Sequence, residues 1–327
     1  MSHAASQTSG SPSPGGPLVV VGDVATDIVC APNGPWRVGS DTDAAIEVRA
    51  GGSAANTAAW AASAVDTATH GQLTDVVFVG RVGSDDASWH RRVLTDVGVD
   101  AQLVVDGTVA TTRIVALIDG VSGERTMLTD RGAGIRLAPA DIDATLIATA
   151  TWVHLSGYLL FAASPQATFR HIVGICREAG VPWSVDPASA GYLGDLGIDT
   201  ARHLLQGASI GFPNSEEARL LAGFFPDGQI EAAACALTKL WGTVVVKLGA
   251  KGAIVARDGA IIGRADSLTV PVVVDAVGTG DAFAGGWLAA MLGGGSDTDC
   301  LTSALRTAAA ALGVIGGRPS GPLPWRA

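Results

Sequence analysis

The sequence predicts an α/β protein with three layers, in which a mostly parallel sheet lies between two layers of helices. Apolar runs of strand length alternate with stretches of helical spacing between residues 151 and 248. This order favours a parallel sheet, because each helix returns the chain to the same end of the sheet. The 327 residues are 48% hydrophobic and include 43 glycines, which suits a large core with many tight turns.

The composition excludes several classes of protein. The formal net charge is −10 and only 5% of the residues are aromatic, which disfavours a nucleic-acid partner. The four cysteines lie far apart without metal-ligand or redox spacing, so we expect reduced thiols in a cytoplasmic protein. No apolar run reaches the roughly 18 residues of a membrane-spanning helix. Residues 1–16, rich in Ser, Pro and Gly, predict a disordered lead-in to a single domain, residues 17–327.

The first predicted strand is Leu18–Val29. It carries Asp27 near its end, where sheets of this class bind ligands, although a lone Asp there is equally typical of a turn. A glycine turn at Gly51–Gly52 then enters an alanine-rich helix, whose small side chains indicate close packing. Asn56 lies in the first turns of this helix, and a polar amide on a close-packed face requires a hydrogen-bond partner.

A strand and an amphipathic helix are predicted next, at Val76–Gly83 and Asp85–Val97. Side chains then follow an alternating pattern on both sides of a turn, in Thr111–Ile118 and Glu124–Thr129. This pattern predicts a two-stranded antiparallel ribbon. Since such a ribbon is not stable alone, we expect it to cover the main sheet or another subunit as a lid, with an edge hairpin as the alternative. The lid segments are placed near residues 31–50 and 101–130.

The second half continues the alternation. Strands are predicted at Thr151–Leu155, Val181–Asp186, Ala208–Phe212 and Gly242–Leu248, and helices at Pro165–Glu178, toward Gln206, at Ser215–Ala222 and at Gln229–Leu240. A hairpin within residues 251–262 turns on Asp258-Gly259. A last helix, Asp299–Val314, precedes a closing loop, Gly316–Ser320.

A glycine-rich turn near the C-terminus is where we expect the chemistry. It comprises Gly278, Thr279, Gly280 and Asp281, between a β-branched run that predicts a buried strand, Val270–Asp275, and a run with helical spacing. Glycine permits the tight turn. The first N–H groups of the helix have no intrahelical partner, so together with the helix dipole they form an anion-binding site.

Asp281 distinguishes this turn from an ordinary phosphate loop. A carboxylate beside an anion-binding turn suits a group that takes a proton from an attacking hydroxyl. The alternative is that Asp281 only caps the helix, as Asp often does.

The glycines at Gly51–Gly52 and the stretch Asp275–Asp281 together resemble the ribokinase, or PfkB, family of carbohydrate kinases. The resemblance covers nearly the whole chain after the lead-in. The family motif is Asp-Thr-x-Gly-Ala-Gly-Asp, from which Ala276 and Thr279 depart. The resemblance implies a three-layer α/β/α ribokinase-like fold with a small β-ribbon lid, and an ATP-dependent kinase.

The resemblance also implies residue roles. Asp281 becomes the general base, and Gly278, Thr279 and Gly280 become the anion hole for the migrating phosphoryl group. Asn214 and Glu217 match an Asn-x-x-Glu motif that helps hold Mg²⁺ and the phosphates. The alternative is structural: Asn214 caps the following helix and Glu217 interacts favourably with the helix dipole.

Three further groups of residues are implied by the resemblance. The acceptor positions are Asp27, Gly52 and Asn56. Arg113 on the ribbon is expected to reach the acceptor or the phosphate, and the alternative is that it is a solvated surface group. The nucleotide positions are Asn214, Gly249 and Gly252, with Lys247 at the end of the preceding strand. The positions of a monovalent-cation loop, for K⁺, are Asp275, Val277, Gly316 and Ser320.

The expected function is phosphorylation of a hydroxymethyl group of a sugar or sugar-like acceptor by ATP and Mg²⁺. Ala25, Ser53 and Ser156 stand where ribokinase proper carries other residues. These departures argue against ribose and leave hexoses, keto-acid sugars and nucleosides open.

Two alternatives remain at this stage. The chain fits an adenosine-like nucleoside kinase if Trp36, Phe161 or Trp183 clamps a base, although core packing explains each as well. It also fits a catalytically silent protein that binds sugar and nucleotide. The lid offers a surface for a homodimer, and a monomer is equally compatible with the fold.

Overall fold

The computed structural model describes residues 15–64, 75–120, 125–223, 225–226 and 228–319. Apart from Gly15 and Gly16, the predicted lead-in lies outside the described residues.

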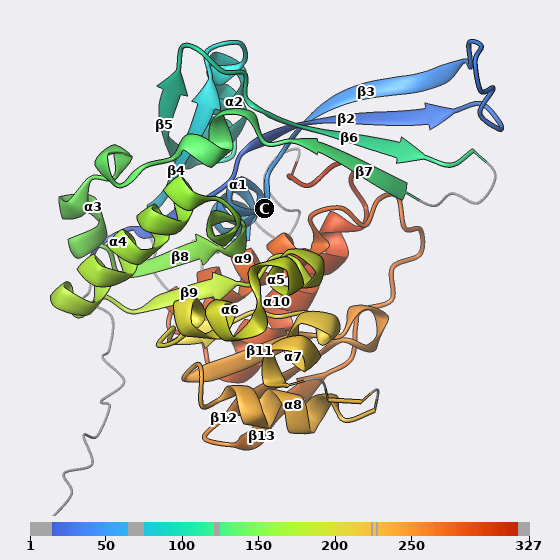
Figure 1. Ribbon diagram of the computed structural model, residues 1–327. Helices are drawn as coiled ribbons and strands as arrows, with labels where there is room; N and C mark the ends of the chain where they lie inside the picture. The colour runs from blue at the N-terminus through green and yellow to red at the C-terminus, as the bar shows by residue number, and fades with distance from the viewer. Residues whose placement is uncertain (1–14, 65–74, 121–124, 224, 227, 320–327) are drawn as a thin grey trace, which may run out of the picture.

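A nine-stranded sheet forms the centre of the fold, in the order β13-β12-β11-β10-β9-β8-β1-β4-β5 (Figure 1). The strands from β11 to β5 run parallel, and β12 and β13 are antiparallel. The bounds are β1 (Leu18–Val21), β4 (Val76–Gly83), β5 (Val99–Asp106), β8 (Trp152–Ser156), β9 (Trp183–Asp186), β10 (Ile210–Gly211), β11 (Thr243–Lys247), β12 (Ala253–Arg257) and β13 (Ala260–Ala265). The predicted mostly parallel sheet is confirmed.

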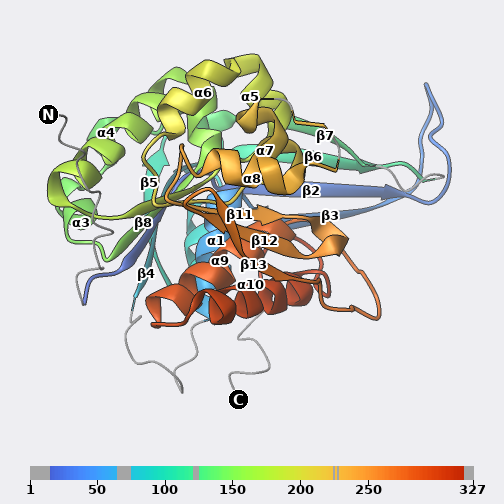
Figure 2. The same cartoon turned by 90° about the horizontal axis from the view of Figure 1, so that it is seen from below.

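Helices cover both faces of this sheet (Figure 2). One face packs against α1 (Ser53–Ala64), α2 (Ala87–Thr95), α9 (Thr279–Leu292) and α10 (Asp297–Ala311). The other packs against α3 (Ala144–Ala148), α4 (Ala163–Ala179), α5 (Ala190–Leu196), α6 (Ile198–Leu205), α7 (Ser215–Ala222) and α8 (Ile230–Leu237). Short 3-10 helices are η1 (Gly132–Arg136), η2 (Pro139–Asp141), η3 (Gly157–Phe161) and η4 (Gly249–Lys251).

The strand β1 shows why its sequence is apolar throughout. Val20 belongs to the core beneath α1 and α9, and Val19 and Val21 belong to the core on the opposite face. A strand covered on both faces needs apolar side chains at every position. The three predicted layers are therefore present.

A second sheet, in the order β3-β2-β6-β7, projects from the main body (Figure 1). Its strands are β2 (Ala25–Pro32), β3 (Ala44–Gly51), β6 (Thr112–Ile118) and β7 (Arg125–Asp130). The pair β6 and β7 is the predicted antiparallel ribbon. In addition, β2 runs parallel to β6 and antiparallel to β3. We call these four strands the lid.

Three expectations from the sequence are corrected. Leu18–Val29 is not one strand, because the chain leaves β1 at residue 22 and enters the lid as β2. Residues 101–106, assigned to the lid, pair with β4 as part of β5. Val270–Asp275 is not a buried strand: Val272 and Val273 are 67% and 60% exposed. Its apolar side chains suggested burial, but burial as a strand requires a neighbouring strand, and none flanks this segment among the described residues.

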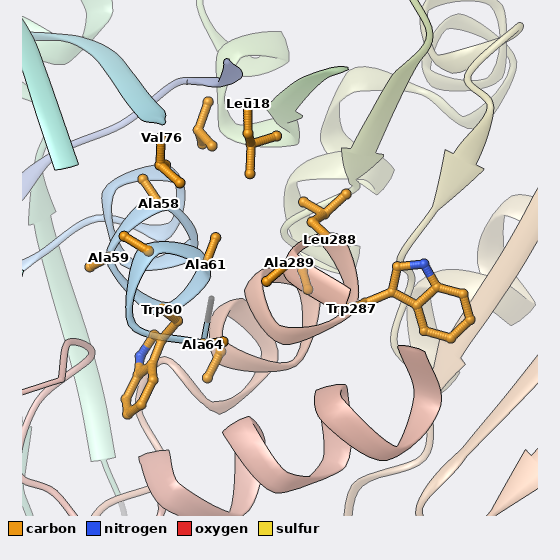
Figure 3. Packing of buried hydrophobic residues seen from close by; sticks show 14 of the residues in the cluster. Leu18, Ala58, Ala59, Trp60, Ala61, Ala64, Val76, Trp287, Leu288 and Ala289 are labelled. Atoms are coloured by element: carbon orange, nitrogen blue, oxygen red, sulfur yellow. The ribbon is translucent and has the colours of Figure 1, made fainter. Parts of the chain in front are cut away.

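Small residues bring α1 and α9 into close contact. A Cβ added at Gly285 of α9 would lie 2.8 Å from the Thr57 carbonyl oxygen of α1. Figure 3 shows the alanines of α1 with Leu18 and Val76 on one side and Leu288 and Ala289 of α9 on another. This contact holds the N-terminal turns of the two helices, which carry polar residues, next to each other.

Candidate active site

A cavity of about 1100 Å³ lies between the lid and the carboxyl ends of the parallel strands. Most of the site residues predicted from the sequence line it: Asp27, Gly52, Asn56, Asn214, Glu217, Lys247, Gly249, Gly252, Val277, Gly278, Thr279, Gly280 and Asp281. These residues come from segments far apart in the chain, which the parallel topology brings to one edge.

Asp281 lies in the first turn of α9. Gly278 precedes the helix with φ +73°, and a Cβ there would lie 2.5 Å from Gly317 Cα, so this position requires glycine. The Ser53 hydroxyl donates to one carboxylate oxygen of Asp281 at 2.7 Å, and Asn56 Nδ2 donates to the other at 2.9 Å. Burial raises the pKa of Asp281 to about 7, although these two hydrogen bonds act to lower it.

These contacts distinguish the two interpretations of Asp281. Within the described residues, the hydrogen bonds to the Asp281 carboxylate do not come from its own helix. Instead it is held by two side chains of α1 and faces the cavity. The partner that Asn56 was expected to need is therefore Asp281.

Lys247, at the end of β11, forms an ion pair with Asp186, at the end of β9. A Cβ at Gly280 would lie 3.2 Å from Lys247 Nζ, so this ammonium is beside the glycine turn. Burial lowers the pKa of Lys247, but Asp186, Glu217 and Asp281 raise it more, and the net shift is upward. Lys247 thus carries a positive charge at the anion-binding end of α9.

Asn214 and Glu217 form a reciprocal cap of α7. Asn214 Oδ1 accepts from the backbone N–H groups of Glu216 and Glu217, each at 2.9 Å. The Glu217 carboxylate accepts from the Asn214 N–H and from Asn214 Nδ2, each at 2.8 Å. Burial and the nearby Asp186 raise the pKa of Glu217 to about 7, while Lys247 lowers it. A buried carboxylate with spare lone pairs at the cavity wall fits a magnesium site.

The donor set also fits what Mg²⁺ needs. No group of three or more metal-ligating acids, histidines or cysteines occurs in the part of the chain that the structure describes. Mg²⁺ usually keeps several waters and binds one or two carboxylates together with substrate phosphates. The buried carboxylate of Glu217, which lines the same cavity as the glycine turn, is consistent with that pattern.

The end of the cavity around Asp23 and Asp27 is acidic. Asp27 is 8% exposed and its Oδ1 has no hydrogen-bond partner among the described residues. Burial raises the pKa of Asp27 to about 7, partly offset by Arg318. Asp23 accepts from the Ser53 N–H at 2.6 Å and from the Ser156 hydroxyl at 2.8 Å. Gly52 has φ +98°, and a Cβ added there would lie 2.5 Å from Val24 Cα, so this position requires glycine.

Arg113 does not line the cavity. Its neighbours Thr112 and Ile114 do, and alternation along a strand turns Arg113 to the opposite side. There it pairs with Asp85 at 2.7 Å. The surface interpretation of this arginine therefore holds.

The predicted cation loop is partly assembled. Asp275 is buried and accepts from the N–H groups of Val277 at 2.9 Å and Gly316 at 3.0 Å. Ser320, the fourth position, lies outside the described residues.

The aromatic residues suggested as a base clamp do not line the cavity. Trp183 is buried in β9 against Phe169, and Trp36 and Phe161 are also absent from the lining. Tyr158 and Tyr192 line it instead. Their sequence neighbourhoods carry no distinctive pattern, so the sequence offered no signal for them.

Two arginines at or near the cavity, Arg131 and Arg318, were also not identified from the sequence. Arg131 lines the cavity, and its guanidinium lies 4.5 Å from the centroid of the Tyr192 ring. It forms no ion pair with any residue in the described ranges. Arg318 lies behind Asn56 in the closing loop.

Comparisons with known proteins identify the family of this chain. A family model described as "pfkB family carbohydrate kinase" matches residues 17–325. The chain belongs to the PfkB family of carbohydrate kinases. This carbohydrate kinase is 27% identical to ribokinase from Arabidopsis thaliana over 319 residues. The alignment covers 94% of this chain and 78% of the relative. The structure of that ribokinase complexed with ribose and ATP superposes with a TM-score of 0.78, at 26% identity and over 94% of this chain and 96% of that one.

Relatives with other names also match this carbohydrate kinase. ATP-dependent ribose-1-phosphate kinase from Halopiger xanaduensis is 31% identical over 270 residues, covering 82% of each chain. Adenosine kinase from Saccharomyces cerevisiae is 28% identical over 261 residues, covering 75% of this chain and 72% of the relative. The relatives therefore share the family and differ in the acceptor that they are named for. No helix within the described ranges of this kinase is long and apolar enough to cross a membrane.

Proposed function

We propose that this carbohydrate kinase transfers the γ-phosphoryl group of ATP to a hydroxymethyl group of a sugar-like acceptor, with Asp281 as general base. The observation that carries the proposal is the position of Asp281: a half-buried carboxylate, held by Ser53 and Asn56, between an acidic acceptor pocket and the glycine turn with Lys247. In the reaction, the acceptor hydroxyl gives its proton to Asp281 and its oxygen forms a bond to phosphorus. The bond from phosphorus to the β-phosphate oxygen breaks, and ADP leaves.

The remaining groups stabilise charge. The N–H groups at the start of α9 and the ammonium of Lys247 face the phosphoryl group, which carries negative charge throughout the transfer. Glu217 and Asn214 would hold Mg²⁺, which would neutralise part of the charge of the ATP phosphates. The lid borders the cavity and would shield it from water, which would strengthen these electrostatic interactions.

The acceptor pocket favours a polyhydroxylated molecule that also has a group for Arg131. Asp23 and Asp27 would accept hydrogen bonds from acceptor hydroxyls, and Arg131, which forms no ion pair within the described ranges, presents N–H donors beside Tyr192. The relative named for ribose 1-phosphate motivates a phosphorylated or carboxylated sugar as acceptor. The second candidate is a nucleoside, which the relative named adenosine kinase and the stacking surface of Tyr158 and Tyr192 support.

Coupled ADP release with Mg·ATP tests the function. The panel holds neutral sugars, keto-acid sugars, sugar phosphates and nucleosides. We expect one class to be turned over far faster than the rest. The Arg131→Gln variant should lose activity selectively on anionic acceptors, with Arg136→Gln, which removes a charge paired to Asp106, as matched control. No turnover on any acceptor, with sugars still raising the melting temperature, would instead indicate a binding protein.

We also propose that the outer face of the lid joins two copies of the kinase. The register places Val48, Ile28, Val115 and Leu128 in one row across the four strands. The alternate row contains Asp27 and Ile114, which line the cavity, so the first row faces away from it. Val48 and Leu128 are 56% and 53% exposed. An exposed apolar sheet face of this kind is typical of an interface.

A charge on this face should therefore prevent association. We expect the wild type to sediment as a dimer and Leu128→Asp as a monomer, because burying an unpaired carboxylate is unfavourable. Ile262→Asp places the same charge on an exposed residue of β13 and should leave the dimer intact. A wild type that is monomeric at micromolar concentration would contradict the proposed dimer.

A further inference from the structure

Arg318 is a buried arginine in the loop after α10, directly behind the catalytic end of α1. Its side chain donates from Nε to Asn56 Oδ1 at 3.2 Å and from Nη2 to the Gly51 carbonyl oxygen at 2.5 Å. The residue is 7% exposed, and its Nη1 has no hydrogen-bond partner among the described residues. A buried guanidinium is costly, so its presence at this position needs an explanation.

The contact with Asn56 determines which way the amide points. A guanidinium only donates hydrogen bonds, so the atom of Asn56 that faces Arg318 must be the acceptor, Oδ1. The other end, Nδ2, is then left to donate to Asp281 at 2.9 Å. With the amide turned round, its oxygen would face the carboxylate oxygen of Asp281, and two acceptors repel each other.

Arg318 also fixes the place from which Asn56 projects. The Gly51 carbonyl belongs to the end of β3, two residues before α1 begins. Gly51 packs directly against the carboxylate of Asp27, since a Cβ at Gly51 would lie 2.1 Å from Asp27 Oδ2. One side chain therefore holds both the start of α1 and the amide in its first turn.

The charge of Arg318 is sustained by its surroundings. Burial lowers its pKa to about 10, while Asp27, Asp23 and Asp281 raise it. It is therefore cationic at neutral pH. The other charged or titratable groups that act on Asp281 are Lys247 of β11 and Asp186 of β9, and Asp281 acts in turn on Tyr158 of η3.

We propose that Arg318 is a positioning residue for the general base, acting through Asn56. It keeps the amide in the orientation that donates to Asp281, and so keeps the carboxylate ionised and aimed at the acceptor hydroxyl. The inference rests on the proposed function, because it assigns a task only if Asp281 accepts the proton. It places a residue from the C-terminal loop, which does not line the cavity, in the same network as the base.

The pH dependence of kcat/KM in the intact kinase tests this role. Loss of a hydrogen bond to a charged group is worth about one to two pH units, so Arg318→Gln should move the acid limb upward by that amount. Turnover at pH 7 should fall by about tenfold or more and recover partly at pH 9. The KM for ATP should stay unchanged. Arg318→Lys keeps the charge and a hydrogen-bond donor. Its acid limb should therefore lie between those of the wild type and Arg318→Gln.

A double-mutant cycle and a control separate positioning from a structural role. In an Asn56→Ala background, Arg318→Gln should shift the limb much less than it does in the wild type, because only the direct effect of the Arg318 charge on Asp281 is left. Arg81→Gln removes a partly buried arginine that bonds Asp106 and Asp141 outside the site, and should lower the melting temperature without moving the limb. An unchanged limb in both Arg318 variants would overturn the proposal, as would full additivity with Asn56→Ala. If Arg318→Gln does not fold, Arg318→Lys and its cycle decide.

Failure of the proposed function gives a different result. If Asp281→Asn keeps full turnover, the wild-type limb does not report Asp281 at all. If Asp281→Asn abolishes turnover and the Arg318 variants leave the limb in place, only the role of Arg318 is lost.

Discussion

Replacing Asp281 by asparagine is expected to cut turnover by at least about 10²-fold, the usual contribution of a positioned general base. The amide has nearly the same shape, so it can still face Ser53 and occupy the first turn of α9. It cannot take the proton of the acceptor hydroxyl. Binding of ATP, measured by titration calorimetry, should persist, because the glycine turn and Lys247 are untouched. Near-normal turnover would remove Asp281 from the mechanism.

Asp281→Asn should also change how the stability of the kinase depends on pH. The pKa of Asp281 is raised to about 7 in the folded kinase from 3.8 as the reference value. The folded state therefore binds more protons than the unfolded state between these values, and wild-type stability falls as pH rises through that window. Asp281→Asn removes this cost. Its melting temperature relative to wild type should be higher at pH 8 than at pH 5.

A matched control uses a carboxylate outside the cavity. Asp143 caps α3 by accepting from the Thr145 and Leu146 N–H groups. Asp143→Asn should leave turnover and its pH dependence unchanged. A comparable loss of turnover there would show that the effect of Asp281→Asn is not specific to the base.

The glycine turn at the start of α9 was predictable because its signal is local. Glycines that permit the turn, a helix N-terminus and an acid three residues into the helix lie within a few positions of one another, from Gly278 to Asp281. Asn214 and Glu217 were predictable for the same reason, since a reciprocal cap is written in four consecutive residues. The parallel order of strands then brings these local motifs to one edge.

Contacts between distant segments were not predictable in this way. Asn56 was known to need a partner, but only the packing of α1 on α9 identifies it as Asp281, 225 residues later. Arg318 lies among glycines and a proline in a closing loop, and nothing in its neighbours indicates burial behind α1. The apolar run Val270–Asp275 misled because β-branched composition predicts a strand only where another strand is available to pair.

Replacing Lys247 by methionine is expected to lower the free energy of unfolding by about 3–5 kcal/mol, the usual cost of removing one partner of a buried ion pair. The ammonium is the counter-charge for Asp186 and also lowers the pKa of Glu217 and of Asp281. Without it, these buried carboxyls are left without their cation. Chemical denaturation at neutral pH measures the loss.

The pH dependence of that loss identifies its cause. Removing the cation raises the folded-state pKa values of Glu217 and Asp281 above about 7, so the variant should be penalised more at pH 8, where the carboxyls must ionise, than at pH 5. Lys247→Met combined with Asp186→Asn removes both charges of the pair and should recover much of the stability. A loss that is equal at both pH values and is not recovered would instead reflect poor packing of methionine. The ammonium also lies beside Gly280, where the proposed mechanism places the phosphoryl group. The double variant should therefore regain stability without regaining turnover.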